Sequence, residues 1–566
     1  MHKMEENAEA ASDPVGPSMM ARNSPTGPLK SWLRYAVPSV GDLVFVLLLA
    51  VLSCGTLAQG LLGDAGIGWH ILTGEWIRRA HAVPRVDPFS SIMQGKPWFA
   101  WEWLYDYVVG SLHTWFGLNG VVLLTAVLIA VTFALVFRRM MARGARLPVA
   151  IVILLLALAA STIHFLARPH VISWLFAVLW FDALEGFTAE GNWRRLAWLP
   201  PSMLVWVNVH GGFVVGLALV GIYSVGSCLA AGTAGEVTER ASASAHARVI
   251  AILGVVCAGI TLANPYGYQL HVHIYRYLTD RFLMDHIDEF LSPNFHGFPQ
   301  RCLALLVLLT VFTLATTRKR VTASQLLVSL FAVYTGLIAS RNIPTSSLLL
   351  AMIVAPQLSF ALRELAENSE VSECVRRAAE RFDSFSLRMA VFDDRLAGKV
   401  WPAFAILMLV WICAHHGWLG GVQTMDARFE DKRFPTKAVD YLARTEHDPA
   451  GQFPGGGVDA GVFCPDRWGG YVIYRLYPQQ LVAVDDRHDL YGGEYFKRYL
   501  KIVRGEPGWR EGLAETRARW VLVPADSVLA GNLISDREWS VAFEDSVAVL
   551  FRRQRRVKNV PVRISE

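Results

Sequence analysis

The chain has 566 residues, of which 53% are hydrophobic and 18% are charged, and its mean hydropathy is +0.34. Soluble domains carry about 25% charged residues, so these values favour a protein that crosses a membrane several times and argue against a soluble enzyme. The net charge of +5 is spread along the chain and does not indicate a nucleic-acid-binding protein.

The N-terminal 36 residues are polar and rich in Pro, Ser and Met, which predicts a disordered segment over residues 1–36. The apolar run that follows starts too late and is too long for a cleavable signal peptide, so we expect it to be the first membrane span. Because a span needs about 20 apolar residues, we predict about eleven spans and a membrane domain over residues 37–420. The predicted spans lie near residues 37–62, 121–137, 148–167, 171–187, 196–210, 212–231, 248–264, 303–317, 323–340, 344–362 and 400–419.

The orientation follows from the basic residues between the spans. Arg and Lys cluster in residues 138–146, 193–195, 318–320 and 363–399, which all fall on one side of the predicted topology. Because basic residues in short loops mark the cytoplasmic side, we expect the N-terminus to be cytoplasmic. With eleven spans, the segment after residue 420 then lies outside the cytoplasmic membrane.

The outer ends of the predicted spans carry polar residues at membrane depth. Polar groups at this depth are costly and usually face a cavity or a substrate. Each of them alone is more typical of a helix cap or an interhelical hydrogen bond, but their position on one side predicts a polar, partly cationic cavity near the outer leaflet. These residues are Asp64, His70, Asp87 and Glu102 in the first outer loop, and Arg168, His170, His210 and Arg341 beyond later spans.

The first outer loop, residues 63–118, contains two predicted helices. The segment ILTGEWIRRA (71–80) has apolar residues at helical spacing and predicts an amphipathic helix on the membrane surface. Two prolines in VPRVDPFS (83–90) end this helix. The segment at 96–116 predicts a second interfacial helix rich in aromatic residues. Two such helices beside a polar cavity could form a groove for a lipid-linked substrate.

Several short motifs follow one another in a fixed order. They are GDAGIGWHILTGEW (63–76), VPRVDPFS (83–90), GKPWFAWEWL (95–104), ARPH (167–170), NVHGGF (208–213), NPYG (264–267), SRNIP (340–344), DRWGGYVIYRLYP (466–478) and VDDRHDLYG (484–492). This order resembles the type C (GT-C) superfamily of integral-membrane glycosyltransferases, in its bacterial branch that uses polyprenyl-phosphate sugars. The resemblance implies a polytopic α-helical fold. It also implies an inverting transfer of a sugar from a polyprenyl-phosphate donor to a glycan, lipid or protein acceptor at the outer face of the bacterial cytoplasmic membrane.

The resemblance also implies roles for single residues. An acidic residue in the first outer loop acts as the general base in such enzymes, and Asp64 matches it. Arg168, His170, His210 and Arg341 are candidates for binding the donor phosphate, and His70 for binding the phosphate or the acceptor.

Some relatives carry a second acidic residue close to the first, where this chain has Gly66. Asp87, Glu102 or Asp288 would then have to supply the second acid. The absence of a DxD motif fits a lipid donor, and we predict no cofactor. A divalent metal remains an alternative through the acidic cluster at 285–289, although this pattern is also typical of a solvated interfacial helix.

The C-terminal segment, residues 421–566, is richer in Gly, Asp and Arg and predicts a small extracytoplasmic α/β domain. We expect a helix at 436–445 and strands within 480–487, 519–526 and 546–553. The segments 466–471 and 484–495 combine aromatic and carboxylate residues, which are typical either of sugar binding or of structural turns. The domain is expected to bind the acceptor or to cover the cavity.

Two other functions use the same features. A transporter or flippase of a lipid-linked sugar would need the cavity without the chemistry, but transporters often show internal repeats and none is visible here. A noncatalytic GT-C-like membrane subunit of a larger complex is compatible with the missing second acid.

Overall fold

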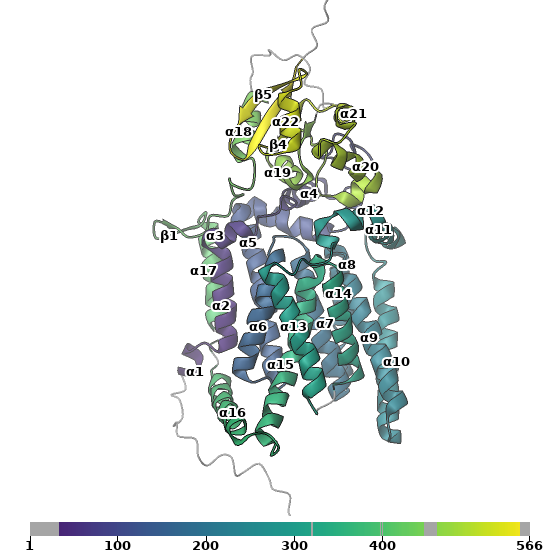
Figure 1. The fold of residues 1–566 in the computed structure, drawn as a ribbon, viewed down its shortest axis with the longest axis vertical. Helices are drawn as coiled ribbons and strands as arrows, with labels where there is room; N and C mark the ends of the chain where they lie inside the picture. The colour runs from purple at the N-terminus through teal and green to yellow at the C-terminus, as the bar shows by residue number, and fades with distance from the viewer. Residues whose placement is uncertain (1–32, 319–320, 397, 399, 447–460, 555–566) are drawn as a thin grey trace, which may run out of the picture.

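The computed structural model describes residues 33–318, 321–396, 398, 400–446 and 461–554. A bundle of long helices carries a small α/β domain at one end, and α16 (Glu373–Asp394) lies at the opposite end (Figure 1). The segment predicted to be disordered lies outside the described residues, except for its last four residues, which form α1 (Leu33–Ala36).

The described part of the chain has seven helices that are long and apolar enough to cross a membrane. They are α5 (Trp103–Ala142), α6 with η2 (Leu147–His164), α7 (His170–Glu190), α9 (Phe213–Thr233), α10 (Val237–Ile260), α13 (Phe298–Thr316) and η5 with α15 (Ser340–Glu367). The remaining predicted spans are shorter helices, namely α2 (Val40–Ser53), α8 (Leu199–Val209), α14 (Ala323–Ile338) and α17 (Val400–Ala414). The predicted class, a polytopic helical protein with a small α/β domain, is confirmed.

The first predicted span is interrupted. Helix α2 ends at Ser53, and α3 (Gly55–Gly60) follows after a break at Cys54, whose backbone is extended. Gly55 has φ +69°, a left-handed conformation that glycine adopts without the steric cost of a side chain. The break explains why one apolar run of the sequence forms two helices.

The two interfacial helices of the first outer loop are packed against each other. The first is α4 (Ile67–Ala80), and the second is the start of α5, which is separated from the membrane-spanning part of α5 by non-helical backbone at Gly117. The predicted second helix is wrong at its beginning, because residues 96–102 form a loop. A Cβ added to Gly74 would overlap the backbone carbonyl of Asp106, so glycine permits this close approach of α4 to α5.

The C-terminal domain contains a four-stranded sheet of order β3-β4-β6-β5, in which only the β3–β4 pair is parallel. Its strands are β3 (Val462–Phe463), β4 (Trp520–Pro524), β5 (Trp539–Glu544) and β6 (Ala548–Arg553), and its helices are α18 (Thr436–Glu446), α19 (Asp466–Leu476), α20 (His488–Val503), α21 (Trp509–Glu515) and α22 (Val528–Ile534). The helix predicted at 436–445 and the last two predicted strands are present. The strand predicted at 480–487 is wrong, since Val482 makes only isolated bridges.

The junction between the two parts of the molecule contains short elements. They are α11 (Tyr268–Thr279), α12 (Arg281–His286) and η4 (Asp288–Phe290), together with the hairpin of β1 (Trp418–Leu419) and β2 (Val422–Gln423) that follows α17. The short helix η3 (Trp193–Arg195) follows the other end of α7, where Arg195 pairs with Glu190. In Figure 1, α4, α11 and α12 lie between the helical bundle and the α/β domain.

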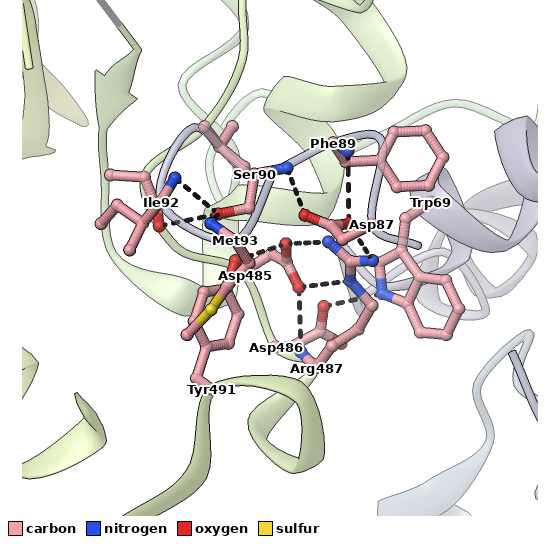
Figure 2. A network of polar contacts seen from close by, with 12 residues as sticks. Trp69, Asp87, Phe89, Ser90, Ile92, Met93, Asp485, Asp486, Arg487 and Tyr491 are labelled. Atoms are coloured by element: carbon pink, nitrogen blue, oxygen red, sulfur yellow. Dashed lines mark hydrogen bonds and ion pairs between the residues drawn. The ribbon is translucent and has the colours of Figure 1, made fainter. Parts of the chain in front are cut away.

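A buried ionic network joins the first outer loop to the C-terminal domain (Figure 2). The Arg487 guanidinium lies 2.7 Å from Asp87 Oδ1 and 2.7 Å from Asp485 Oδ2, and all three side chains are buried. Its carbon also lies 4.7 Å from the centre of the Trp98 ring. Because each buried charge has a partner, the network fixes the loop against the domain without an unpaired charge.

Candidate functional site

A cavity of about 510 Å³ lies where the bundle, the first outer loop and the C-terminal domain meet. Its polar lining includes Glu102, Asp106, His164, Arg168, His170, Ser173, His210, Glu289, Arg341, Asn342, Asp486, Arg487, His488 and Asp489. Its apolar lining includes Val214, Val215 and Ala218 of α9, Ile274 and Leu278 of α11 and Phe331 of α14. The structure thus brings together residues from segments that are hundreds of positions apart in the sequence.

Arg168 connects the membrane domain to the C-terminal domain. It is placed by the short loop between η2 and α7, and its Nη1 lies 2.9 Å from Asp486 Oδ2 and 3.5 Å from Asp64 Oδ1. Burial raises the pKa of Asp486 to about 6, even though Arg168 lowers it. Asp64 also accepts a hydrogen bond from the Gly66 backbone at 2.7 Å.

Asp64 lies beside the cavity and is connected to it through Arg168. Its side chain is 32% exposed and contacts Arg168, which lines the cavity, while Asp64 itself is outside the lining in the described part of the chain. Asp64 and Asp486 therefore flank the same guanidinium. An acceptor would have to reach Asp64 past this ion pair or displace it.

The position of Gly66 explains why no second acid stands beside Asp64. A Cβ at Gly66 would overlap both the Arg168 guanidinium and the Asp486 carboxylate. A side chain of any size at this position would separate the ion pair. Instead, the second carboxylate beside Arg168 comes from Asp486 in the C-terminal domain. Sequence reasoning missed Asp486, although it lies within the quoted motif VDDRHDLYG.

Glu102 lies between two imidazoles. Its Oε2 is 3.8 Å from His70 Nε2, its Oε1 is 3.8 Å from His210 Nε2, and its side chain is 12% exposed. Burial raises the pKa of Glu102 to about 8, with Asp489 and Glu289 acting in the same direction and Arg168 and Arg341 opposing them.

His70 lies behind Glu102 and is fully buried. Its Nδ1 lies 2.5 Å from Asp106 Oδ1. Burial, with the neighbouring charge of Arg168, lowers the pKa of His70 well below its usual value, so its ring is neutral. The close packing of α4 against α5 brings these two side chains together.

Arg341 provides a second guanidinium in the cavity. It follows α14 in η5, lies 3.4 Å from Glu289 Oε1, and its carbon is 4.6 Å from the centre of the Phe290 ring. Burial raises the pKa of Glu289, but Arg341 together with His164, Arg168 and His488 outweighs this effect, and the pKa is lowered overall. Near Arg168, His170 Nε2 donates a hydrogen bond to the His164 carbonyl at 2.8 Å, which orients its ring in the cavity wall.

Two predicted candidates for the second acid lie elsewhere. Asp87 belongs to the buried network of Arg487, and Asp288 is exposed on η4. In the alternative metal cluster, Asp285 pairs with Arg281 and the His286 ring contacts the Phe282 carbonyl. Among the described residues, no group of three or more His, Cys, Asp and Glu side chains is arranged to hold a metal ion.

The C-terminal domain covers the cavity through the segment that starts α20. Asp486 to Asp489 line it, and Asp489 also lies 2.9 Å from His273 Nε2 of α11. His488 is held by Asp466 at 2.9 Å. In this segment, predicted as either sugar-binding or structural, Asp485 belongs to the buried network, while its neighbours Asp486 to Asp489 line the cavity.

No family model and no curated protein matches the sequence, but solved structures match the fold. The apo oligosaccharyltransferase of Archaeoglobus fulgidus aligns with a TM-score of 0.51 at 10% identity, covering 86% of this chain and 69% of that chain. The same archaeal enzyme, AglB, in complex with an inhibitory peptide and a dolichol-phosphate, aligns with a TM-score of 0.51 at 11% identity over the same shares of the chains. The chain has the same fold as this archaeal oligosaccharyltransferase. ArnT from Cupriavidus metallidurans, bound to undecaprenyl phosphate, aligns over 90% of this chain and 96% of that chain at 14% identity, with a TM-score of 0.43.

The shared fold confirms the polytopic helical fold that was inferred from the order of the motifs. At identities of 10–11% the likeness concerns the fold, and the roles of single residues in this chain remain proposals.

Proposed function

We propose that this GT-C protein is an inverting glycosyltransferase that moves a sugar from a polyprenyl-phosphate donor to an acceptor at the outer face of a bacterial cytoplasmic membrane. The observation that carries the proposal is the composition of the cavity. One part of its lining presents two arginines and several carboxyls, and another part is apolar and lies on helices of the membrane domain. A substrate with a charged sugar-phosphate head and a hydrocarbon chain matches both parts.

Arg168 and Arg341 would hold the donor phosphate. Each lines the cavity and is paired with a carboxylate, Asp486 or Glu289, whose place a phosphate oxygen can take. Guanidinium groups bind phosphate with two parallel hydrogen bonds, which gives both strength and orientation. They would also stabilise the negative charge that develops on the phosphate as the glycosidic bond breaks.

The hydrocarbon chain of the donor would lie along α9, α11 and α14. Val215 and Phe331 belong to the apolar lining there, and neighbouring helices present exposed apolar side chains to the surroundings. AglB, which shares the fold, has been solved with a dolichol-phosphate. This likeness supports a lipid phosphate as the ligand of the present cavity.

Asp64 would act as the general base. It would take the proton from an acceptor hydroxyl, whose oxygen attacks the anomeric carbon from the face opposite the phosphate and so inverts the configuration. A base has to come within hydrogen-bond reach of that hydroxyl. The support for Asp64 is its contact with Arg168, which places it next to the proposed phosphate site.

The proposal is tested with purified protein in lipid bilayers. Wild type and Asp64→Asn are incubated with radiolabelled polyprenyl-phosphate sugars and with glycan, lipid and protein acceptors of the cell envelope. We expect transfer by wild type and a loss of about 100-fold or more in Asp64→Asn. The exposed Asp526, changed to Asn, is the matched control and should transfer normally.

Other outcomes favour the alternative functions. Full activity in a folded Asp64→Asn variant would contradict the role of the base. Binding of the donor without transfer, in both proteins, would favour a transporter of lipid-linked sugars. Failure of the wild type to bind any donor would favour a noncatalytic subunit.

A further inference from the structure

The proposed mechanism leaves Glu102 without a role, although its carboxyl lines the cavity. The groups around it determine which protonation state it fits. The Gly212 backbone N–H donates to His210 Nδ1 at 3.0 Å, and the Ser173 hydroxyl lies 2.8 Å from the same nitrogen. A backbone N–H can only donate, so Nδ1 carries a lone pair and the proton of the neutral ring is on Nε2. This N–H faces Glu102 Oε1 at a distance of 3.8 Å between Nε2 and Oε1, which is longer than a hydrogen bond.

The other oxygen of Glu102 faces a different partner. His70 Nε2 is buried and has no hydrogen-bond partner among the described residues. It lies 3.8 Å from Glu102 Oε2, which is also longer than a hydrogen bond. Among the described residues, no arginine or lysine lies within ion-pair distance of Glu102, and burial keeps both neighbouring imidazoles neutral. A buried carboxyl without a cation to pair with is favoured in its neutral form.

The charges around the cavity favour the same state. The negative charges of Glu289 and Asp489 oppose the positive charges of Arg168 and Arg341 at Glu102. Burial raises the pKa of Glu102 to about 8, so the side chain is mostly neutral at pH 7. A neutral Glu102 also avoids repulsion of a phosphate bound by the two arginines.

We propose that Glu102 is a general acid of the proposed transfer reaction, donating its carboxylic proton to the phosphate of the lipid donor. In this step the bond between the anomeric carbon and the phosphate oxygen breaks, and its electron pair stays on that oxygen. The Glu102 proton passes to the phosphate, while the proton of the acceptor hydroxyl passes to Asp64. Solvent exchange then returns a proton to Glu102 and removes one from Asp64. This inference rests on the proposed function.

The first test measures binding rather than turnover. Full-length protein in nanodiscs is titrated with undecaprenyl phosphate between pH 7 and pH 9.5, above the pKa of Asp486 of about 6 and the second pKa of a phosphate monoester of about 6. In the wild type, ionisation of Glu102 places a negative charge beside the phosphate, so we expect affinity to fall by about tenfold as the pH rises through 8. Glu102→Gln keeps the shape and removes the ionisation, so its affinity should match that of the wild type at pH 7 and stay constant. The exposed Glu190, changed to Gln, is the control.

The second test is the rate of transfer. Glu102→Gln should lower kcat by about 100-fold or more, and the fall in wild-type kcat above pH 8 should disappear, because the variant has no acid to lose. A purely structural role would not change the shape of the pH profile. An unchanged kcat, or a binding profile with the same pH dependence in Glu102→Gln as in the wild type, would overturn the proposal.

A third measurement separates this inference from the proposed function. Infrared difference spectra between pH 6 and pH 9 report the C=O band of a protonated carboxyl. Loss of that band in Glu102→Gln would support a neutral Glu102, and an identical spectrum would overturn it. Wild type that binds undecaprenyl phosphate but transfers no sugar would refute the transferase and the acid step, while the band and the binding profile would still report the state of Glu102.

Discussion

Arg168 is the residue on which the site depends most directly, because it contacts groups from both parts of the molecule. Its guanidinium lies between Asp64 of the first outer loop and Asp486 of the C-terminal domain. Burial disfavours the charged form of Asp486, and the Arg168 guanidinium is the positive charge that opposes this effect. Both the charge and the planar shape of the guanidinium would contribute to phosphate binding, and different substitutions of Arg168 can test them separately.

Changing Arg168 to Lys should keep the charge but lose the paired hydrogen bonds to phosphate. We expect undecaprenyl phosphate to bind about tenfold more weakly, and Arg168→Ala to weaken binding by about 100-fold, since Asp64 and Asp486 would then repel the phosphate without a neighbouring cation. Equilibrium binding in nanodiscs measures both effects. The control is Arg194→Ala, a change of an exposed arginine of η3 that is outside the cavity lining. Equal affinities in Arg168→Ala and wild type would remove Arg168 from the phosphate site.

The residues of the site were predictable to different degrees. Arg168, His170, His210 and Arg341 were found because polar side chains at the ends of apolar runs are conspicuous, and the structure brings all four to one cavity. Asp486 and Glu289 lie in polar segments, where a carboxylate is ordinary. Only the three-dimensional contact with an arginine distinguishes them.

At the scale of elements, the packing of α4 against α5 determines the position of His70. Gly74 of α4 packs against the backbone of α5 at Asp106. Gly110 of α5 packs equally closely against α4, since a Cβ added to Gly110 would lie 2.7 Å from the backbone nitrogen of Glu75. Without side chains at these two positions, the helix backbones approach closely. This approach lets His70 reach Asp106 at 2.5 Å.

Changing Gly74 to Ala should force α4 away from α5. We expect a loss of about 1–3 kcal/mol in stability, the usual cost of overpacking, and a lower transfer rate because His70 and Glu102 would move relative to the cavity. Thermal unfolding and kcat measure the two effects. Gly60→Ala is a matched control, since nothing lies within 4 Å of a Cβ added there. If Gly74→Ala melted and turned over like Gly60→Ala, the close contact would be unimportant.

The elements themselves were largely predictable, because apolar runs and helical spacing reflect burial directly. The exceptions have local causes. The helix at the start of α5 begins at Trp103 rather than at residue 96, and α2 is separated from α3 at Cys54 beside a left-handed glycine. The apolar segment at 480–487 looks like a strand, but Val482 makes only one isolated bridge to Ser90 of the first outer loop and one to Val462 of β3. Such contacts between distant segments leave no periodic pattern in the sequence.

For the whole molecule, the two ends of the bundle differ in chemistry. One end carries the cavity and the α/β domain, and the other carries α16 and the basic α5–α6 loop, where Arg146 pairs with Asp383 of α16 (Figure 1). Basic residues near the ends of spans favour the cytoplasmic side. The cavity and its cover would then face outward, where the donor lipid presents its sugar.

This orientation predicts opposite labelling of two cysteines in intact cells. Cys374 lies on α16 and is exposed, and Val528 on the outer surface of α22 is 61% exposed and can be changed to Cys. A membrane-impermeant maleimide should label Val528→Cys in intact cells and Cys374 only after the membrane is opened. The double variant Val528→Cys, Cys374→Ser lacks the cysteine on α16 and therefore shows which signal comes from Cys374. Labelling of Cys374 in intact cells, with Val528→Cys protected, would place the cavity on the cytoplasmic side and would exclude a donor presented at the outer face.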